Sequence, residues 1–228
     1  MRRLYKILIA AGVAVVLLVG GLYAGWYFFI KADTKPRAEI KETPVVQGGA
    51  LDGRYRVAPG DAQSFVGYRV VEKFVTAPLE STATGRTSEM NGGFTIEGRT
   101  VKDVNVTANL LSLKSDRDMR DNRIKTLGLE SERFPESKFV LAEPMNFRSV
   151  PKQGETVRAT AVGDFTLHGV TRRVSIPVEG RWDGRDIQVI GNLHVVFADY
   201  GITAPTSPVV ANIKDEGEME FQIFFRKV

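Results

Sequence analysis

Residues 163–180, GDFTLHGVTRRVSIPVEG, predict two β-strands joined by a short turn. In the second half Val174, Ile176 and Val178 alternate with polar residues, and a period of two is typical of a half-buried strand. In the first half two apolar residues are spaced by a threonine in the same way. The residues LHGVT between the two halves make up the turn, so the stretch predicts a hairpin with one buried face.

The same alternation recurs along the chain from residue 54 to the C-terminus. It is clearest at the end, where Met219, Phe221, Ile223 and Phe225 alternate with charged or polar residues. Roughly eight or more such strands, separated by turn signals, predict an all-β fold, either an antiparallel barrel or a sandwich. Closing the sheet would place the apolar faces inside and remove exposed strand edges.

Three local signals modify this pattern. Residues 115–127 begin with a Ser and an acidic residue three positions on, which predicts a short, charged surface helix. Asn91-Gly92 predicts the turn of a second hairpin. Pro177 has no N–H to donate to a ladder, so it predicts a bulge or a local break in strand pairing.

The N-terminus has a different composition. Residues 1–6 are basic, and residues 7–30 contain no charged side chain. A membrane-spanning helix needs about 20 mostly apolar residues, so we expect a transmembrane anchor over 7–30. A cleaved signal peptide, with its apolar region of about 7–15 residues, and a buried core helix are the alternatives. The polar residues 31–53 then predict a flexible linker.

Composition limits the kinds of partner and chemistry. Residues 1–52 carry seven Lys/Arg and four Asp/Glu, whereas residues 53–228 carry 24 and 23. The domain therefore has no overall cationic excess, and we expect no nucleic-acid partner. The chain has no Cys, which excludes disulfides and thiolate sites.

No catalytic or metal-binding motif stands out. His168 and His194 are the only histidines, and neither has the neighbouring ligands of a metal site. We predict that both are exposed structural residues. There is no nucleophile-elbow motif either. We therefore expect no enzyme activity, no metal and no resident cofactor.

Five segments, in order along the chain, resemble the YceI-like family. They are SFVGY at 64–68, Arg120-Asp121, FPESKF at 134–139, the hairpin turn at 163–172 and DYGI at 199–202. The family often has a histidine just before the first segment and another near the end of that strand. Here those positions are Gln63 and Glu72, so no role of these histidines carries over.

The resemblance implies a lipocalin-like, eight-stranded antiparallel barrel that holds an isoprenoid-type lipid, either a polyprenyl chain or a quinone tail. It also implies export of the barrel. Long domains that follow an anchor are translocated largely regardless of the charges that flank it, which agrees with export. We therefore expect a single-pass bacterial membrane protein with residues 1–6 in the cytoplasm, an anchor at 7–30, a linker at 31–53 and an extracytoplasmic barrel at 54–228.

The inward-facing apolar residues are the candidate cavity lining. They are Val66, Tyr68, Phe94, Ile96, Val106, Leu110, Phe139, Leu141, Phe165, Ile176, Leu193, Val195, Phe197, Phe221 and Ile223. Alternation alone identifies an interior and does not distinguish a cavity from a filled core. The hypotheses are thus a lipid carrier or buffer and, alternatively, a filled barrel that docks a membrane partner.

Overall fold

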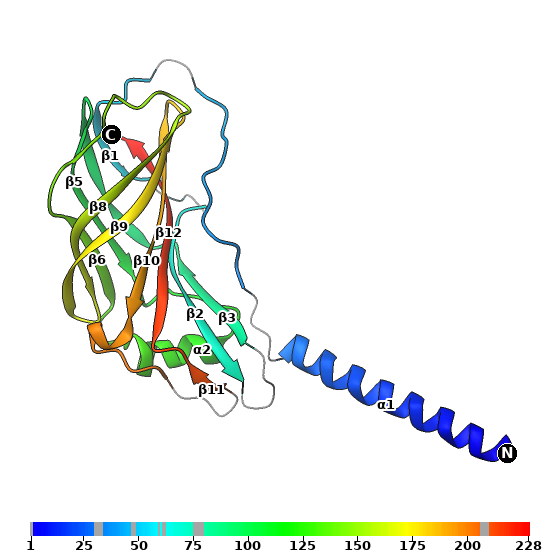
Figure 1. Ribbon diagram of the computed structural model, residues 1–228. Coiled ribbons are helices and arrows are strands. Elements are labelled where there is room, and N and C mark those ends of the chain that lie inside the picture. Colours follow the sequence, from blue (N-terminus) through cyan, green and yellow to red (C-terminus); the bar gives the residue numbers. More distant parts are fainter. Residues whose placement is uncertain are drawn as a thin grey trace. The chain divides into compact units, whose positions relative to one another are not determined.

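The computed structural model describes residues 2–29, 34–46, 49–58, 60, 63–74, 80–205 and 210–228 (Figure 1). The chain divides into two compact units, Met1–Asp33 and Thr34–Val228. The first contains the helix α1, Arg2–Phe29, and the second contains the β-structure.

The helical structure of α1 is confirmed. Its sequence contains Ala, Leu and other residues that favour a helix, and it has no proline in its interior. Several of its apolar side chains are exposed, among them Val16 at 71% and Leu17 at 70%. Among the described residues, however, no helix meets the combined length and hydropathy of a membrane span. The predicted transmembrane anchor is therefore not confirmed.

The second unit is almost entirely antiparallel β-structure. Its elements are β1 (Gly53–Val57), β2 (Phe65–Phe74), β3 (Glu80–Thr87), β4 (Met90–Glu97), β5 (Thr100–Asn109), α2 (Asp118–Arg123), the π-helical turn η1 (Ile124–Gly128), β6 (Glu136–Leu141), β7 (Met145–Asn146), β8 (Thr156–Leu167), β9 (Val170–Trp182), β10 (Asp186–Val196), the 3-10 turn η2 (Phe197–Tyr200), β11 (Val210–Ile213) and β12 (Glu216–Lys227).

Eight of the described strands close into a barrel. The order is β1-β4-β5-β6-β8-β9-β10-β12, and β12 pairs back onto β1. Beyond the end of β1, β2 takes its place beside β12, and β3 pairs with β2. The predicted all-β barrel with a short helix is confirmed, and the sandwich alternative is excluded.

The hairpin that the sequence indicated most clearly is formed by β8 and β9. Its register runs from Thr156↔Arg181 to Leu167↔Val170. His168 and Gly169 form the turn, with φ of 52° and 74°. Positive φ at both central residues is the geometry that matches the twist of two strands, and the glycine adopts it without strain.

Pro177 marks a break in pairing, as predicted. It stays in register with Thr160 of β8. On its other side, the ladder between β9 and β10 ends at Val178↔Gly191. Among the described residues, the first half of β9 and the second half of β10 are therefore not paired with each other, although the former still pairs with β8 and the latter with β12. We call this place the β9–β10 seam.

Two local predictions are wrong. The residues around Asn91-Gly92 do not form a hairpin, because both lie inside β4, which pairs with β1 and β5 and not with β3. The helix begins at Asp118 rather than near Ser115. Ser115 instead donates from its backbone N and its hydroxyl to the Asp121 carboxylate, at 2.9 and 2.7 Å.

Residues 34–46, which we name the strap, differ most from expectation. They were predicted to belong to a flexible linker, yet they lie along the outside of the barrel. The strap begins where Thr34 donates to the Thr82 carbonyl at 2.6 Å. It ends where the Val46 N–H donates to the Asp183 carbonyl at 2.7 Å. It therefore belongs to the folded unit, which begins at Thr34 and not at residue 54.

Polar side chains on the outer face of the sheet hold the strap. Gln188, which is 4% exposed, accepts from the Lys41 N–H and donates to the Glu39 carbonyl. Arg69 donates to the Lys35 carbonyl at 2.5 Å and pairs with the buried Glu220 at 2.7 Å. An extended segment satisfies its backbone in this way without joining the sheet.

Candidate functional site

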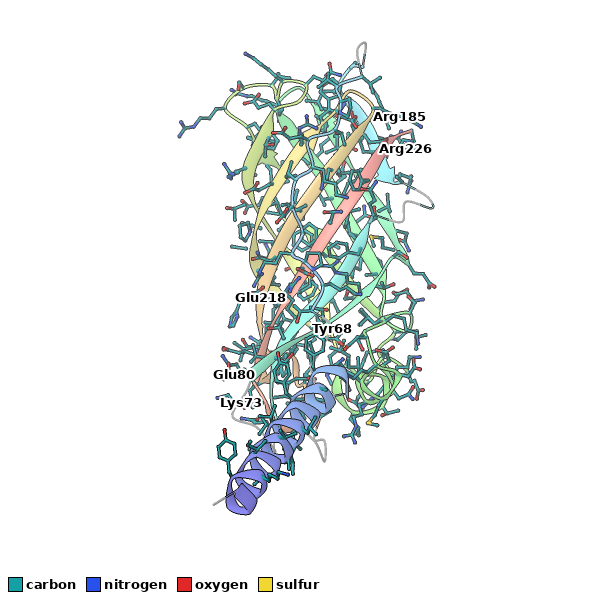
Figure 2. All side chains as sticks on the ribbon, turned by 90° about the vertical axis from the view of Figure 1, so that its right-hand side faces the viewer. Tyr68, Lys73, Glu80, Arg185, Glu218 and Arg226 are labelled. Atoms are coloured by element: carbon teal, nitrogen blue, oxygen red, sulfur yellow. The ribbon has the colours of Figure 1, made fainter. Side chains whose placement is uncertain are left out.

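Two apolar cavities lie inside the barrel, one towards each end. The Trp182-end cavity, of about 160 Å³, reaches from the middle of the barrel to Trp182, Pro151 and Glu155. The α2-end cavity, of about 70 Å³, is bounded by Leu113 and Leu129, which precede α2 and follow η1 in the chain, and by other residues. Figure 2 shows the two ends, with Arg185 and Arg226 at one and Lys73 and Glu80 at the other.

The Trp182-end cavity is enclosed by the larger of the two core clusters. Tyr55 stacks on Phe94 with centroids 5.4 Å apart, and Phe94 meets the edge of Phe225 at 4.8 Å. The Tyr55 hydroxyl donates to the Leu51 carbonyl at 2.7 Å. Burial, with a smaller contribution from Asp52, raises the pKa of Tyr55 to about 12. It therefore remains a neutral hydroxyl within this core cluster.

A constriction separates the cavities. Val66, Ser137, Phe165 and Met219 line both of them. Methionine is unbranched and adapts its shape easily, so Met219 is the member of this ring that can move with least cost. The two cavities together form an interrupted path along the barrel axis.

Glycine keeps part of this path open by letting an aromatic ring lie against the wall. Gly191 of β10 faces Phe221 of β12 in the register. A Cβ on Gly191 would approach the Phe221 ring to 2.6 Å. With glycine there, the ring covers the wall and does not fill the centre of the lumen.

The α2 end is closed by a buried ionic group. Glu72 continues the inward-facing series of β2, and Arg120 of α2 reaches it at 3.0 Å. Arg120 also contacts Asp116. Burial opposes the charge of Arg120, but hydrogen bonding and the charge of Glu72 keep its pKa above the usual range. Burial has the opposite effect on a group that is neutral when protonated: it raises the pKa of Tyr68, whose hydroxyl stays protonated.

His168 is not exposed, contrary to prediction. Its side chain is 9% exposed, its Nε2 lies 2.7 Å from a Glu130 carboxylate oxygen and its Nδ1 lies 3.0 Å from the Tyr200 carbonyl. Its ring packs against Phe134 at 4.4 Å. The FPESKF, hairpin-turn and DYGI segments thus meet around this one histidine. His194 is exposed as expected, at 60%.

Most of the predicted lining comes together. All but two of the predicted residues line one of the cavities: Val66, Phe94, Ile96, Val106, Phe139, Phe165, Ile176, Phe221 and Ile223 the first, and Val66, Tyr68, Leu110, Phe165, Val195 and Phe197 the second. Leu141 is the last residue of β6, where the chain leaves the barrel wall. Leu193 lies beyond the β9–β10 ladder and packs against the α2-end core. Neither borders a cavity.

The sequence analysis missed several wall residues. Trp182 was within reach, because it continues the alternation of Ile176 and Val178 along β9. Met219 belonged to the clearest alternating strand. Leu51 gave no signal, since it lies in a segment interpreted as linker.

The described residues contain no cluster suited to a metal ion. No group of three or more His, Asp or Glu side chains among them is arranged to hold a metal ion. That the chain is not an enzyme stays a prediction.

The family can now be assigned. A family model described as the YceI-like domain matches residues 55–225. The chain belongs to the YceI-like family. The UPF0312 protein Shewmr4_1178 of Shewanella sp. (strain MR-4) is 32% identical over 143 residues, which are 59% of this chain and 71% of that protein. A UPF0312 protein of Pseudomonas putida (strain W619) is 27% identical over 69% of this chain and 81% of its own length.

Solved structures share the YceI-like fold. One is described as a polyisoprenoid binding domain from Saccharophagus degradans implicated in plant cell wall breakdown. It is 17% identical, with a TM-score of 0.57, and the match covers 76% of this chain and 98% of that one. Burkholderia cenocepacia BcnA is 16% identical, with a TM-score of 0.53 and coverage of 72% and 96%. At these identities the likeness concerns the fold.

Proposed function

We propose that this YceI-like protein binds an isoprenoid-type lipid in the barrel and carries or buffers it outside the cytoplasm. The observation that carries the proposal is the apolar path formed by the two cavities. Its wall consists mostly of aliphatic and aromatic side chains, with a few charged residues, Lys138, Glu155, Arg181 and Glu218, among them. The polyisoprenoid-binding structure from Saccharophagus degradans has the same fold, which supports this choice of ligand class.

The size of the cavities makes the proposal more specific. A cavity near 150 Å³ holds a molecule about the size of benzene, and the Trp182-end cavity has about 160 Å³. A long polyprenyl chain therefore needs more room than this conformation gives. The gain of about 25 cal/mol for each Å² of apolar surface buried favours widening. Movement of Met219 and opening at the β9–β10 seam are two local changes that would widen the cavity.

We also propose that α1 attaches the barrel to the cell membrane. The support is the uncharged run of residues 7–30 and the exposed apolar side chains of α1, such as Val16 and Leu17. Flotation with phospholipid vesicles tests this attachment. The full chain should float, whereas residues 34–228 should stay at the bottom of the gradient.

Mass spectrometry of the organic extract tests the lipid. Residues 34–228, purified without detergent, keep the strap and the barrel together. A stoichiometric isoprenoid in the extract would support the proposal, and its head group would separate a quinone from a polyprenyl carrier. A clean extract, followed by failure of the delipidated protein to bind quinones and polyprenols of ten to forty carbons, would reject it.

The second candidate is a filled barrel that docks a membrane partner. The constriction at Phe165 and Met219 favours it, because two small separate cavities resemble packing defects more than a ligand site. In that case Met219→Ala would join the cavities without creating lipid binding. In the lipid-binding case the same change should speed uptake, because it removes the side chain that must move.

A further inference from the structure

One stretch of the barrel wall has an unpaired strand edge. β8 pairs with β9 along its whole length, but it pairs with β6 only over residues 163–166. β6 ends at Leu141, and the next strand, β7, pairs with β5 instead. Among the described residues, positions 156–161 of β8 therefore have no strand on the side away from β9. We call this place the β7–β8 gap.

Backbone groups of β8 point into the β7–β8 gap. The Val162 carbonyl accepts from the Ala142 N–H at 3.0 Å, so it faces away from β9. Backbone direction alternates from residue to residue in an antiparallel strand, so the N–H and C=O groups of Arg158 and Thr160 face the same way. Pro177, which has no N–H, stands opposite Thr160 on β9 and agrees with this phase. The gap thus presents hydrogen-bond donors and acceptors that no described strand pairs with.

A polar groove of about 630 Å³ follows this edge. From β8 it is lined by Val157 and Ala159, which also border the lumen, and by Thr156 and Arg158, which are exposed. Neighbouring side chains of a strand point to opposite faces of the sheet, so a groove lined by both sets runs along the edge of the strand. Residues 143–149, which include β7, form its other side.

In the described part of the wall, no strand ladder separates this groove from the Trp182-end cavity. The residues that line both spaces are Met145, Phe147, Glu155, Val157 and Ala159. The Phe147 N–H donates to the Arg99 carbonyl at 2.9 Å, which holds its backbone in place. An opening between the two spaces therefore needs rotation of side chains such as Phe147 and Met145, and no ladder has to break.

The groove has no net charge. It contains two carboxylates, Glu143 and Glu155, and two guanidinium groups, Arg148 and Arg158. Arg158 is also paired with Glu179, at 2.8 Å. A phosphate is best held by an excess of cationic groups, whereas the unpaired backbone groups of β8 suit a head group that is polar and uncharged. An alcohol or a quinone has this chemistry.

We propose that the lipid enters the Trp182-end cavity sideways through the β7–β8 gap, with its tail in the cavity and an uncharged polar head group in the groove. The inference rests on the lipid binding proposed above. It places the tail among apolar side chains and the head group where β8 offers unpaired hydrogen-bonding groups. Neither end of the barrel then has to open for the lipid to enter.

A removable cross-link across the gap tests the entry path in the full chain. The natural sequence has no Cys, so Asn146→Cys/Thr156→Cys places one thiol on each side of the groove. Bifunctional methanethiosulfonate reagents of increasing length join the two thiols, and reduction releases them. Asp164→Cys/Arg173→Cys is the matched control, because these half-exposed residues are register partners on β8 and β9 and lie outside the groove.

We expect the cross-linked gap variant to take up decyl-ubiquinone about tenfold more slowly than the same variant after reduction, and the control pair to show no such difference. Trp182 lines the cavity, so quenching of tryptophan fluorescence reports arrival of the quinone. Equal rates before and after reduction would overturn the entry path and leave lipid binding intact. Failure of every reagent to join the two thiols would contradict the geometry of the groove. No uptake by the natural protein would overturn the proposed lipid binding itself.

Two ligands with the same tail test the head group. Farnesol and farnesyl phosphate differ in the phosphate alone, and we expect the alcohol to displace decyl-ubiquinone with about tenfold higher affinity. Equal or tighter binding of the phosphate would overturn the assignment of an uncharged head group.

A charge change in the groove shows whether the head group lies there. Glu143→Lys should raise the affinity for farnesyl phosphate and leave that for farnesol unchanged. Glu132→Lys makes the same charge change at an exposed site outside the groove and should affect neither ligand. Equal effects of the two variants on the phosphate would place the head group elsewhere.

Discussion

The two ends of the barrel differ in the side chains that the strands direct inward: one end is apolar and the other contains a buried ion pair. At the Trp182 end, apolar side chains of β4, β5, β8 and β12, among others, line a cavity, and the Tyr55 hydroxyl of the surrounding core cluster donates to the Leu51 carbonyl. At the α2 end, the inward series of β2 changes from Val66 and Tyr68 to Glu72, which pairs with Arg120. One end thus contains the larger apolar cavity, and the other contains a buried ion pair.

Breaking the charged end should have the largest effect. Arg120→Met leaves Glu72 buried without its arginine and removes one of the two arginine contacts of Asp116, and loss of one member of a buried pair costs about 3–5 kcal/mol. Denaturant unfolding should show this loss. The double variant Glu72→Gln/Arg120→Met should recover much of it, and equal stability of the single variant and the natural protein would contradict the assignment.

Filling the apolar end should abolish binding with less effect on stability. Ala161 of β8 is buried and borders the Trp182-end cavity, so Ala161→Trp occupies the space that the proposed lipid would fill. We expect lipid affinity to fall by more than about 30-fold, or roughly 2 kcal/mol, in a quinone titration. Thr160→Trp, on the outer face of the same strand, should bind normally. Normal binding by both variants would exclude this cavity.

The strap, which joins the two ends, should show a smaller effect. Gln188→Leu removes two bonds to the strap backbone, and we expect a loss of about 1–3 kcal/mol with faster proteolysis between residues 34 and 46. Gln222→Leu is the control, because Gln222 is equally buried but bonds to Gln63 outside the strap. Similar proteolysis of both variants would mean that Gln188 does not hold the strap.

The smallest effect should come from pH. A hydrogen bond from Arg37 of the strap lowers the pKa of Glu218. The folded pKa is thus below the unfolded one, so the stabilisation is fully present above the ordinary carboxyl range and is lost as the pH falls through the lowered value. The difference in Tm between the natural protein and Glu218→Gln should therefore shrink from pH 6 to pH 3. A constant difference would argue against the pair.

The same comparison explains what the sequence could predict. Period-two alternation identified the inner face of the barrel, from Phe94 to Ile223, because side-chain direction in a strand depends only on position. It did not identify the strap. Arg69, Gln188 and Glu220 alternate outward and indicate solvent, yet they are buried because the strap covers them. An extended segment held through its backbone leaves no periodic trace of its own.

Local turn signals failed for a related reason. Asn91-Gly92 has the composition of a hairpin turn, but tertiary pairing places it inside β4 between β1 and β5. Period-two alternation also could not predict which inward-facing residues line a cavity and which belong to the filled core. Leu193 has the same alternation as Val195, yet only Val195 borders a cavity, whereas Leu193 packs against the core cluster at the α2 end.

The strap also determines how the protein would respond to mechanical force. A pull on the N-terminal side reaches the folded unit first at Thr34. The bonds from the strap to Thr82, Thr84 and Gln188 would therefore bear the load one after another. Hydrogen bonds that are loaded one at a time break at a lower force than bonds that share the load. The strap would therefore detach and lengthen the tether before any ladder of the barrel is stretched, and the two cavities would keep their shape under load.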